Sequence, residues 1–271
     1  MRLFRARGRD DDVSTPRPLL APVVALVQAG RYAEAEAAAR AVAAERPEHA
    51  PLALSLAALS TGAQGRHAEA LAGYDELLPV FGRQFGAEHP QTLLLRSNRA
   101  QTLTALGRHA ECEAECAAVA RAATQVKGPE RQRMTAAARN GQIYALNAQG
   151  RHPQAERLAR ETLAAHHTAD RFALTLRLGL ARSLNGQGRH EEAFAEARQA
   201  ATLNRRLPEE ARRTETGAVE LAMAGALLGL GRTAEARTRA TTAHDACTAA
   251  FGSHHYRTTE ARELLDRIDN A

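Results

Sequence analysis

The chain has 271 residues, of which 44% are hydrophobic, and a formal net charge of +5. Only 4% are aromatic and tryptophan is absent, so a core must be built mainly from alanine and leucine, which favours closely packed helices. Arginine supplies almost all of the positive charge and is interleaved with glutamate rather than grouped with stacking aromatics. This pattern argues against a nucleic-acid-binding surface.

The first part of the chain is expected to be a tail. Residues 1–16 combine a basic segment, three aspartates and Ser-Thr-Pro, a composition that cannot bury enough apolar area to order itself. We therefore predict a flexible tail over 1–16 and a repeat domain over 17–271. No apolar run is long enough for a secretory signal or a membrane span, and three cysteines without a C-x-x-C argue against a disulfide framework. The expectation is a cytoplasmic protein with no membrane partner.

One short phrase, Gly-Arg followed by a ring or small residue and then Glu-Ala or its near equivalent, occurs six times. The copies begin at Gly30, Gly65, Gly107, Gly150, Gly188 and Gly231, which lie 35 to 43 residues apart. A period of this size is typical of stacked supersecondary units. Each glycine is expected to end one helix, and the alanine five residues later to let the next helix pack closely.

The phrase divides the chain into six helix–turn–helix pairs and a closing helix. The predicted pairs are 19–29 with 32–45, 52–63 with 67–81, 91–106 with 109–126, 131–149 with 152–167, 171–187 with 190–206, and 210–230 with 233–250. A lone helix over 256–268 is expected to cap the stack. The fold class is therefore all-α, with about six repeats and a C-terminal capping helix.

These features together resemble the tetratricopeptide repeat (TPR) family. Two copies of a boundary phrase, 85–92 (FGAEHPQT) and 251–258 (FGSHHYRT), are similar to the kinesin-light-chain type of repeat. Departures from the family pattern are the His that usually follows Gly-Arg, Cys112 in place of one alanine, and the missing first-helix aromatic. The resemblance implies a right-handed superhelical solenoid whose first helices line a concave groove for peptides or partner proteins. It does not imply a particular partner.

The sequence contains no recognisable catalytic set. It lacks a phosphate-binding Gly-Lys-Ser/Thr loop, G-x-S-x-G and H-E-x-x-H, and the match to G-x-G-x-x-A at 229–234 ends a predicted helix instead of following a strand. The equivalent residues His67, His109, His152 and His190 are expected to be half-buried rings, since neighbouring helices lie too far apart for them to share an ion. We predict no enzyme activity and no cofactor.

One local cluster leaves open the interpretation that it binds a metal ion. His109, Cys112 and Cys116 share a helix face and offer three soft ligands, but cysteine is also a competent small core residue. Packing is the favoured interpretation, and no metal site is predicted. The histidine pairs 166–167 and 254–255 are expected to be solvated in loops.

The candidate binding site comes from aligning the first helices on their terminal glycines. Positions ten, six and three residues before each glycine share one helical face and are expected to point into the groove. In the third to fifth repeats the polar members are Ser97, Gln101, Thr104, Asn140, Tyr144, Asn147, Arg182 and Asn185. Amide side chains can bond a peptide backbone and Arg182 can clamp a carboxylate. The equal alternative is that the concave face is polar only because it is solvated.

A second set, Arg96, Arg139 and Arg177, lies eleven residues before the glycines. These arginines either pair with acidic side chains of neighbouring helices or extend a surface for an acidic ligand. The sixth first helix is apolar nearly all round over 221–230, so either the closing helix or a second subunit is expected to cover it. The second alternative would make a homodimer through the C-terminal repeats.

The leading functional prediction is a non-catalytic scaffold that binds a protein or peptide partner, with an acidic segment as one option. A regulatory sensor for a small molecule or signalling peptide is the main alternative, and an accessory subunit of an enzyme complex is a third.

Overall fold

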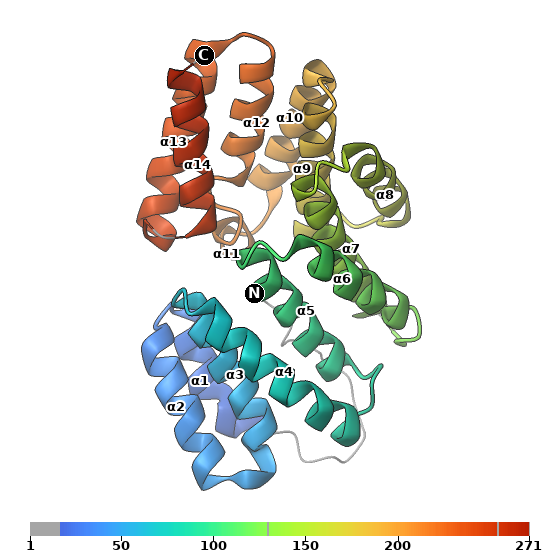
Figure 1. Cartoon of the computed structure of the whole chain (residues 1–271), viewed down its shortest axis with the longest axis vertical. Coiled ribbons are helices and arrows are strands. Elements are labelled where there is room, and N and C mark those ends of the chain that lie inside the picture. The colour runs from blue at the N-terminus through green and yellow to red at the C-terminus, as the bar shows by residue number, and fades with distance from the viewer. Residues whose placement is uncertain (1–16, 129, 254, 271) are drawn as a thin grey trace. The chain divides into compact units, whose positions relative to one another are not determined.

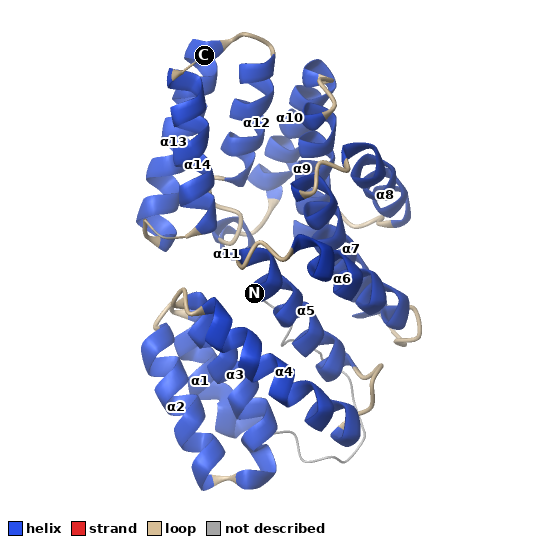
Figure 2. Ribbon diagram, viewed as in Figure 1, coloured by secondary structure: helices blue, strands red, loops and turns tan. Residues whose placement is uncertain are grey.

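The computed structural model describes residues 17–128, 130–253 and 255–270. The predicted tail over 1–16 lies outside the described residues. Within them, all the regular elements are helices (Figure 2), which confirms the all-α fold predicted from the sequence. The chain divides into two compact units, the first ending at Leu106 and the second beginning at Gly107.

The first unit contains five α-helices and one 3-10 turn in its described part. They are α1 (Arg17–Gln28), α2 (Tyr32–Glu45), η1 (Pro47–His49), α3 (Ala50–Ala63), α4 (His67–Gln84) and α5 (Pro90–Ala105). Each α-helix packs against the next, and α3 also packs against α1 and α5. This is the neighbour pattern expected of stacked helix pairs.

The second unit continues the pattern (Figure 1). Its helices are α6 (His109–Ala123), α7 (Glu130–Ala148), α8 (His152–Ala165), α9 (Arg171–Gly186), α10 (His190–Arg206), α11 (Glu209–Arg213), α12 (Ala218–Gly229), α13 (Thr233–Phe251) and α14 (Tyr256–Asp269). The first helices of successive pairs pack together, α7 on α9 and α9 on α12.

The repeated Gly-Arg phrase forms the turn within each pair. All six of its glycines have a positive φ, between 71° and 85°, a conformation that a Cβ disfavours. The alanine or cysteine five residues after each glycine is at most 1% exposed, which lets the second helix approach its neighbours closely. Both sequence-based reasons for the phrase are therefore confirmed.

The sixth pair departs from its predicted form. A single helix was expected over 210–230, but the chain forms α11, a turn, and then α12. Gly217 starts α12 with φ 75° and lies against Cys247, so a side chain there would overlap the cysteine sulfur. In the turn, the buried Glu215 carboxylate accepts hydrogen bonds from Arg171 at 3.1 Å and Arg257 at 2.7 Å. The break therefore joins the start of α9 to the start of α14.

The apolar helix α12 is covered by its own chain. It packs against α9, α10, α13 and α14, and Leu221, Ala224 and Leu227 belong to one buried cluster with Leu264 and Ile268 of α14. The closing helix is thus the cover, which removes the reason for expecting a homodimer at this helix. None of the described helices is both long and apolar enough to cross a bilayer.

Candidate functional site

The first helices of the second unit bring two predicted groove residues into contact. Tyr144 of α7 and Arg182 of α9 both lie six residues before the glycine of their repeat, and the Arg182 guanidinium carbon lies 5.3 Å from the centre of the Tyr144 ring. This distance is typical of a cation–π contact. Aligning the helices on their glycines therefore identified a true neighbour relationship.

Arg182 also holds a carboxylate. Glu260 of α14 forms an ion pair with it. The Glu260 side chain is 32% exposed and the Arg182 side chain is 41% exposed. The sixth repeat has Gly225 at the position equivalent to Arg182. The first helix of that repeat, α12, therefore has no side chain at the position that Tyr144 and Arg182 occupy in theirs. An acidic side chain from the closing helix meets Arg182 instead, and the sequence analysis missed it.

The environment of Tyr144 is consistent with a partly dry site. Burial raises the pKa of its hydroxyl above the ordinary value, against an opposing effect of the Arg182 charge. The His109 ring centre lies 6.5 Å from that of Tyr144. The nearby Asn140 is half-buried and makes no side-chain hydrogen bond to another described residue. The accessible polar groups of this surface are therefore Asn140, Tyr144 and Arg182, which we call the Tyr144–Arg182 face.

Two predicted groove asparagines have internal partners. Asn147 is 5% exposed; its amide donates to the Gly179 carbonyl oxygen at 3.1 Å, and its oxygen lies 3.0 Å from His152 Nδ1. Asn185 repeats the second contact, with its oxygen 2.7 Å from His190 Nδ1. Asn147 therefore joins two repeats, and both amides hold the turn histidine of their own repeat. A role of these two residues in binding would be indirect.

The remaining predicted groove residues lie on α5 in the first unit. Ser97 and Thr104 are half-buried and donate their hydroxyls to carbonyl oxygens of their own helix, Leu93 and Ala100. Gln101 is exposed. Their role in binding stays a prediction.

The second predicted set, Arg96, Arg139 and Arg177, is spread over both units, and its members have different partners. Arg177 forms an ion pair with Glu196 of α10 at 2.8 Å, as expected of an arginine that pairs with a neighbouring helix. Arg139 donates to the Gln142 amide oxygen of its own helix at 3.0 Å, and Arg96 lies in the first unit with an interaction of its own. Of the two interpretations of this set, pairing with an acidic side chain of a neighbouring helix is therefore the one observed at Arg177.

The arginine of the repeated phrase has a structural role that the sequence analysis did not assign. In all six repeats it occupies the N-cap position of the second helix without a capping bond from its side chain, which instead bonds the Glu or Gln three residues on. The acceptors are Glu34, Glu69, Glu111, Gln154, Glu192 and Glu235. Such exposed pairs contribute little to stability because solvent screens their charges. The phrase thus encodes a turn, and its residues are not evidence of a ligand.

In three repeats the same arginine also joins a buried carboxylate cluster. Glu156 of α8, for example, accepts from Gln187 at 2.8 Å and from Arg189 at 2.8 Å. Burial raises the pKa of Glu156, but the hydrogen bonds outweigh it and the net pKa lies below its ordinary value. Glu36 and Glu113 form equivalent clusters with the turns that follow them.

The cysteines are buried packing residues, whereas the histidines of the described part of the chain range from buried to exposed. No group of three metal-binding side chains occurs there, and Cys112 and Cys116 are at most 5% exposed, with their sulfurs 3.9 Å apart. The expectation of solvated loop histidines is wrong for His166, which is 7% exposed and bonds Asp170 at 2.8 Å. His255 is also half-buried, because it caps α14 through a bond from the Arg257 amide.

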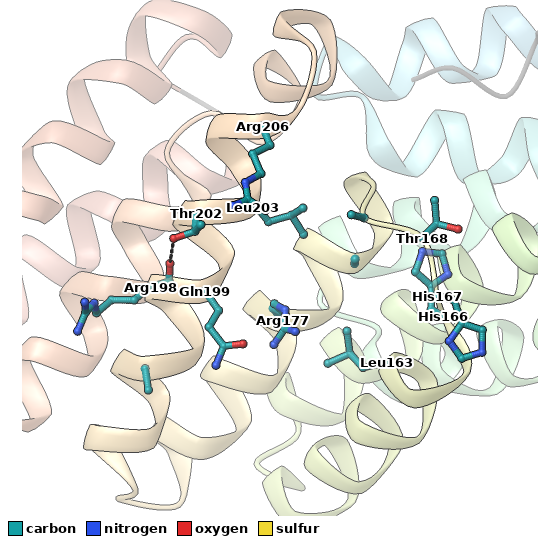
Figure 3. Close-up of a pocket in the computed structure, with 13 residues that line it drawn as sticks. Leu163, His166, His167, Thr168, Arg177, Arg198, Gln199, Thr202, Leu203 and Arg206 are labelled. Carbon is teal, nitrogen blue, oxygen red and sulfur yellow. Dashed lines mark hydrogen bonds between the residues drawn. The ribbon is translucent and has the colours of Figure 1, made fainter.

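The second unit also contains a hollow of about 680 Å³ beside α9 and α10. Arg177, Arg198 and Arg206 are among the residues that line it, and Arg182 is not (Figure 3).

Comparison with known proteins identifies the repeats. Residues 48–111 match the tetratricopeptide repeat family model. The fold matches a protein from Podosopora anserina described as a kinesin light chain with nearly identical TPR-like repeats, at 20% identity over 72% of this chain and 93% of that chain, with a TM-score of 0.52. Residues 48–111 therefore match tetratricopeptide repeats, and the chain shares the fold of a protein with TPR-like repeats. A comparison with curated protein sequences gave no significant match.

Two further structures of similar fold contain bound molecules. PlcR of Bacillus thuringiensis, in complex with the peptide PapR7 and DNA, has a TM-score of 0.59 at 15% identity, covering 82% of this chain and 74% of its own. A Rap protein complexed with Competence and Sporulation Factor has a TM-score of 0.60 at 13% identity, covering 92% and 73%. At these identities the likeness establishes the shared fold.

The kinesin-light-chain-like phrases form one repeated module within the TPR fold. In each, a histidine ring stacks on the preceding phenylalanine, with centres 5.3 Å apart for Phe85 and His89 and 4.4 Å for Phe251 and His255. Each histidine accepts the amide hydrogen two residues on. Threonines 92 and 258 donate to the glycine carbonyl of their own phrase. The module therefore shapes the entry into α5 and α14.

Proposed function

We propose that this TPR protein is a non-catalytic scaffold that binds an acidic segment of a peptide or protein on the Tyr144–Arg182 face. The observation that carries the proposal is the Arg182–Glu260 ion pair beside the Tyr144 ring. In this pair the Arg182 guanidinium donates to a carboxylate while its side chain stays partly exposed, which supports the proposal. The proposal includes the cytoplasmic location expected from the sequence and requires no cofactor.

In this proposal an acidic side chain of the partner replaces Glu260. A bidentate arginine–carboxylate contact is among the stronger hydrogen-bonded pairs, and the tyrosine ring restrains the guanidinium. Asn140, whose amide has no internal partner among the described residues, supplies a donor and an acceptor for the partner's backbone. Asn147 and Asn185 support the face indirectly by fixing the turns after α7 and α9.

A second candidate is a sensor for a signalling peptide. It is favoured by the PlcR and Rap neighbours, whose structures contain PapR7 and Competence and Sporulation Factor. Both candidates use the same face, and they differ in whether binding changes the conformation of the protein.

The test uses fluorescence anisotropy with a labelled glutamate-rich peptide and a matched lysine-rich peptide. The wild type should bind the acidic peptide, and Arg182→Gln should weaken it by about tenfold or more, since a charged hydrogen bond is worth about 1.5–3 kcal/mol. Glu260→Gln should strengthen binding because it removes the internal competitor. The control is Arg160→Gln, which also removes one arginine charge. Arg160 lies on α8, where it pairs with Glu156, and is not part of the Tyr144–Arg182 face. Equal binding of the two peptides, or an unchanged affinity in Arg182→Gln, would refute the assignment.

A further inference from the structure

The hollow of the second unit lies between the loop after α8, the first half of α9 and the last half of α10 (Figure 3). Its volume of about 680 Å³ is within the range of small-molecule sites. Leu163 and Leu203 supply apolar wall, and Gln199 and Thr202 supply neutral polar groups. Its residues are separate from the Tyr144–Arg182 face.

The charge of the lining has one sign. Arg177, Arg198 and Arg206 all line the hollow, and no aspartate or glutamate does. Arg177 is already oriented by its ion pair with Glu196. Arg198 and Arg206 have no ion pair with any described residue. The lining therefore includes two arginines without an internal carboxylate, Arg198 and Arg206, and a third, Arg177, that Glu196 holds in place.

Comparison with the other repeats shows that the availability of Arg198 is a local feature. Arg198 follows the glycine of its repeat by ten residues, as do Arg40 and Arg160. Each of those two arginines pairs with a glutamate four residues earlier, Arg40 with Glu36 at 3.0 Å and Arg160 with Glu156 at 2.9 Å.

The fifth repeat has Phe194 where these glutamates stand. Phe194 packs against three of the buried apolar clusters of the second unit and offers no acceptor. The sequence change that extends the core therefore also leaves the Arg198 guanidinium without its internal carboxylate, beside the hollow.

The ligand class follows from the number of donors. Three guanidinium groups present several forked pairs of N–H donors, which match the oxygens of phosphate bidentately. A single carboxylate can engage only part of this set, whereas a diphosphate offers more oxygens and more negative charge.

We propose that this hollow is a binding site for a phosphorylated small molecule that carries a diphosphate group. Arg177, Arg198 and Arg206 bind the phosphate oxygens, and the rest of the ligand lies along Leu163 and Leu203. The inference is independent of the acidic-peptide face, because the two sites share no residue.

The test is isothermal titration calorimetry of the full chain with pyrophosphate and with ADP, in about 150 mM salt so that diffuse surface attraction is screened. The wild type should bind one equivalent of each probe, with ADP the tighter because its nucleoside part contacts the apolar wall. Arg198→Gln and Arg206→Gln should each weaken both probes by about tenfold. Both residues are exposed, so the variants should keep the wild-type melting temperature.

The matched control is Arg160→Gln, which removes the equivalent arginine of the preceding repeat and should change the affinity less than about twofold. A phosphoserine peptide is a third probe: tighter binding of that peptide than of pyrophosphate or ADP would assign the site to a phosphorylated protein and overturn the small-molecule proposal. No saturable binding of any probe, or equal losses in Arg160→Gln and Arg198→Gln, would also overturn it. Arg182→Gln should leave pyrophosphate binding unchanged, which separates this result from the test of the acidic-peptide face.

Discussion

The Cα of Gly186 lies directly against the imidazole of His152, so closely that a Cβ on the glycine would overlap the ring. Gly229 has the same relationship with His190 one repeat later. In both cases the histidine starts the second helix of one pair and the glycine ends the first helix of the next. The histidine of the repeated phrase is therefore a spacer between repeats, and its ring is oriented by an asparagine.

Replacing Gly186 by alanine should destabilise the protein. Alanine is normally better than glycine in a helix by about 1 kcal/mol, but here the new methyl group must displace a ring that Asn147 holds. We expect a net loss of about 1–2 kcal/mol in the free energy of unfolding, measured by urea denaturation. Gly82→Ala in α4 is the control, because nothing lies within 4 Å of its Cβ position, and it should be neutral or stabilising. A stabilised Gly186→Ala variant would contradict the packing.

Asn147→Ala should reduce stability more than Asn140→Ala. The first change removes the donor to the Gly179 carbonyl and the partner of His152, which leaves polar groups unpaired and costs about 1–3 kcal/mol. The second removes an amide that has no partner among the described residues, so it should change stability by less than about 0.5 kcal/mol. Chemical denaturation of both variants checks this, and equal losses would show that the two amides have equivalent surroundings.

Glu156→Ala should cost more stability than Glu192→Ala, although Arg189 bonds both carboxylates. The Glu156 side chain is 13% exposed and also accepts from Gln187, so its loss should cost about 1.5–3 kcal/mol. Glu192 is 54% exposed, so solvent screens its pair and the loss of that pair should change stability little. Thermal melts at constant pH measure the difference. A larger loss in Glu192→Ala would be the contrary outcome.

Acidification should weaken the closing helix through His255. Burial, with a smaller contribution from Arg257, lowers the pKa of His255 to about 4, whereas the unfolded chain titrates near 6.5. Because the unfolded state binds the proton first, stability is complete above about pH 6.5, falls as the pH drops toward 4, and then levels off. Allowing for solvent screening, the loss should be about 1–2 kcal/mol.

His255→Asn keeps a helix-capping side chain without a titrating group. Its free energy of unfolding, measured by urea denaturation from pH 7 to pH 4, should depend less on pH than that of the wild type. Identical pH profiles for the two proteins would show that His255 does not titrate between the folded and unfolded states as described.

The helix pairs were predictable to within a few residues because their signals are local. The predicted range 32–45 is that of α2, and 190–206 is that of α10. The break at Gly217 was missed, since a single glycine between a charged segment and an alanine- and leucine-rich run does not by itself indicate a turn. What ends α11 is the requirement of Glu215 for two arginines from other helices, and no local pattern reveals it.

The candidate site was only partly predictable. Helical periodicity placed Tyr144 and Arg182 on one face correctly, and it placed Asn147 and Asn185 beside them. It could not distinguish an amide that faces solvent from one that bonds a histidine of the following turn. Phe194 at a position occupied by glutamate in other repeats was the signal, visible in the sequence, that Arg198 lacks an internal partner.

The sequence by itself determined the repeat period, the turn glycines, the buried alanines and the residues that share a helical face, because these depend on backbone geometry within one or two turns of a helix. The tertiary structure decided which side chains meet. Arg182 and Glu260 are 78 positions apart, and the hollow beside α9 combines residues of three elements. Such contacts depend on how neighbouring helices pack, and the packing is determined by the whole buried surface rather than by any one segment.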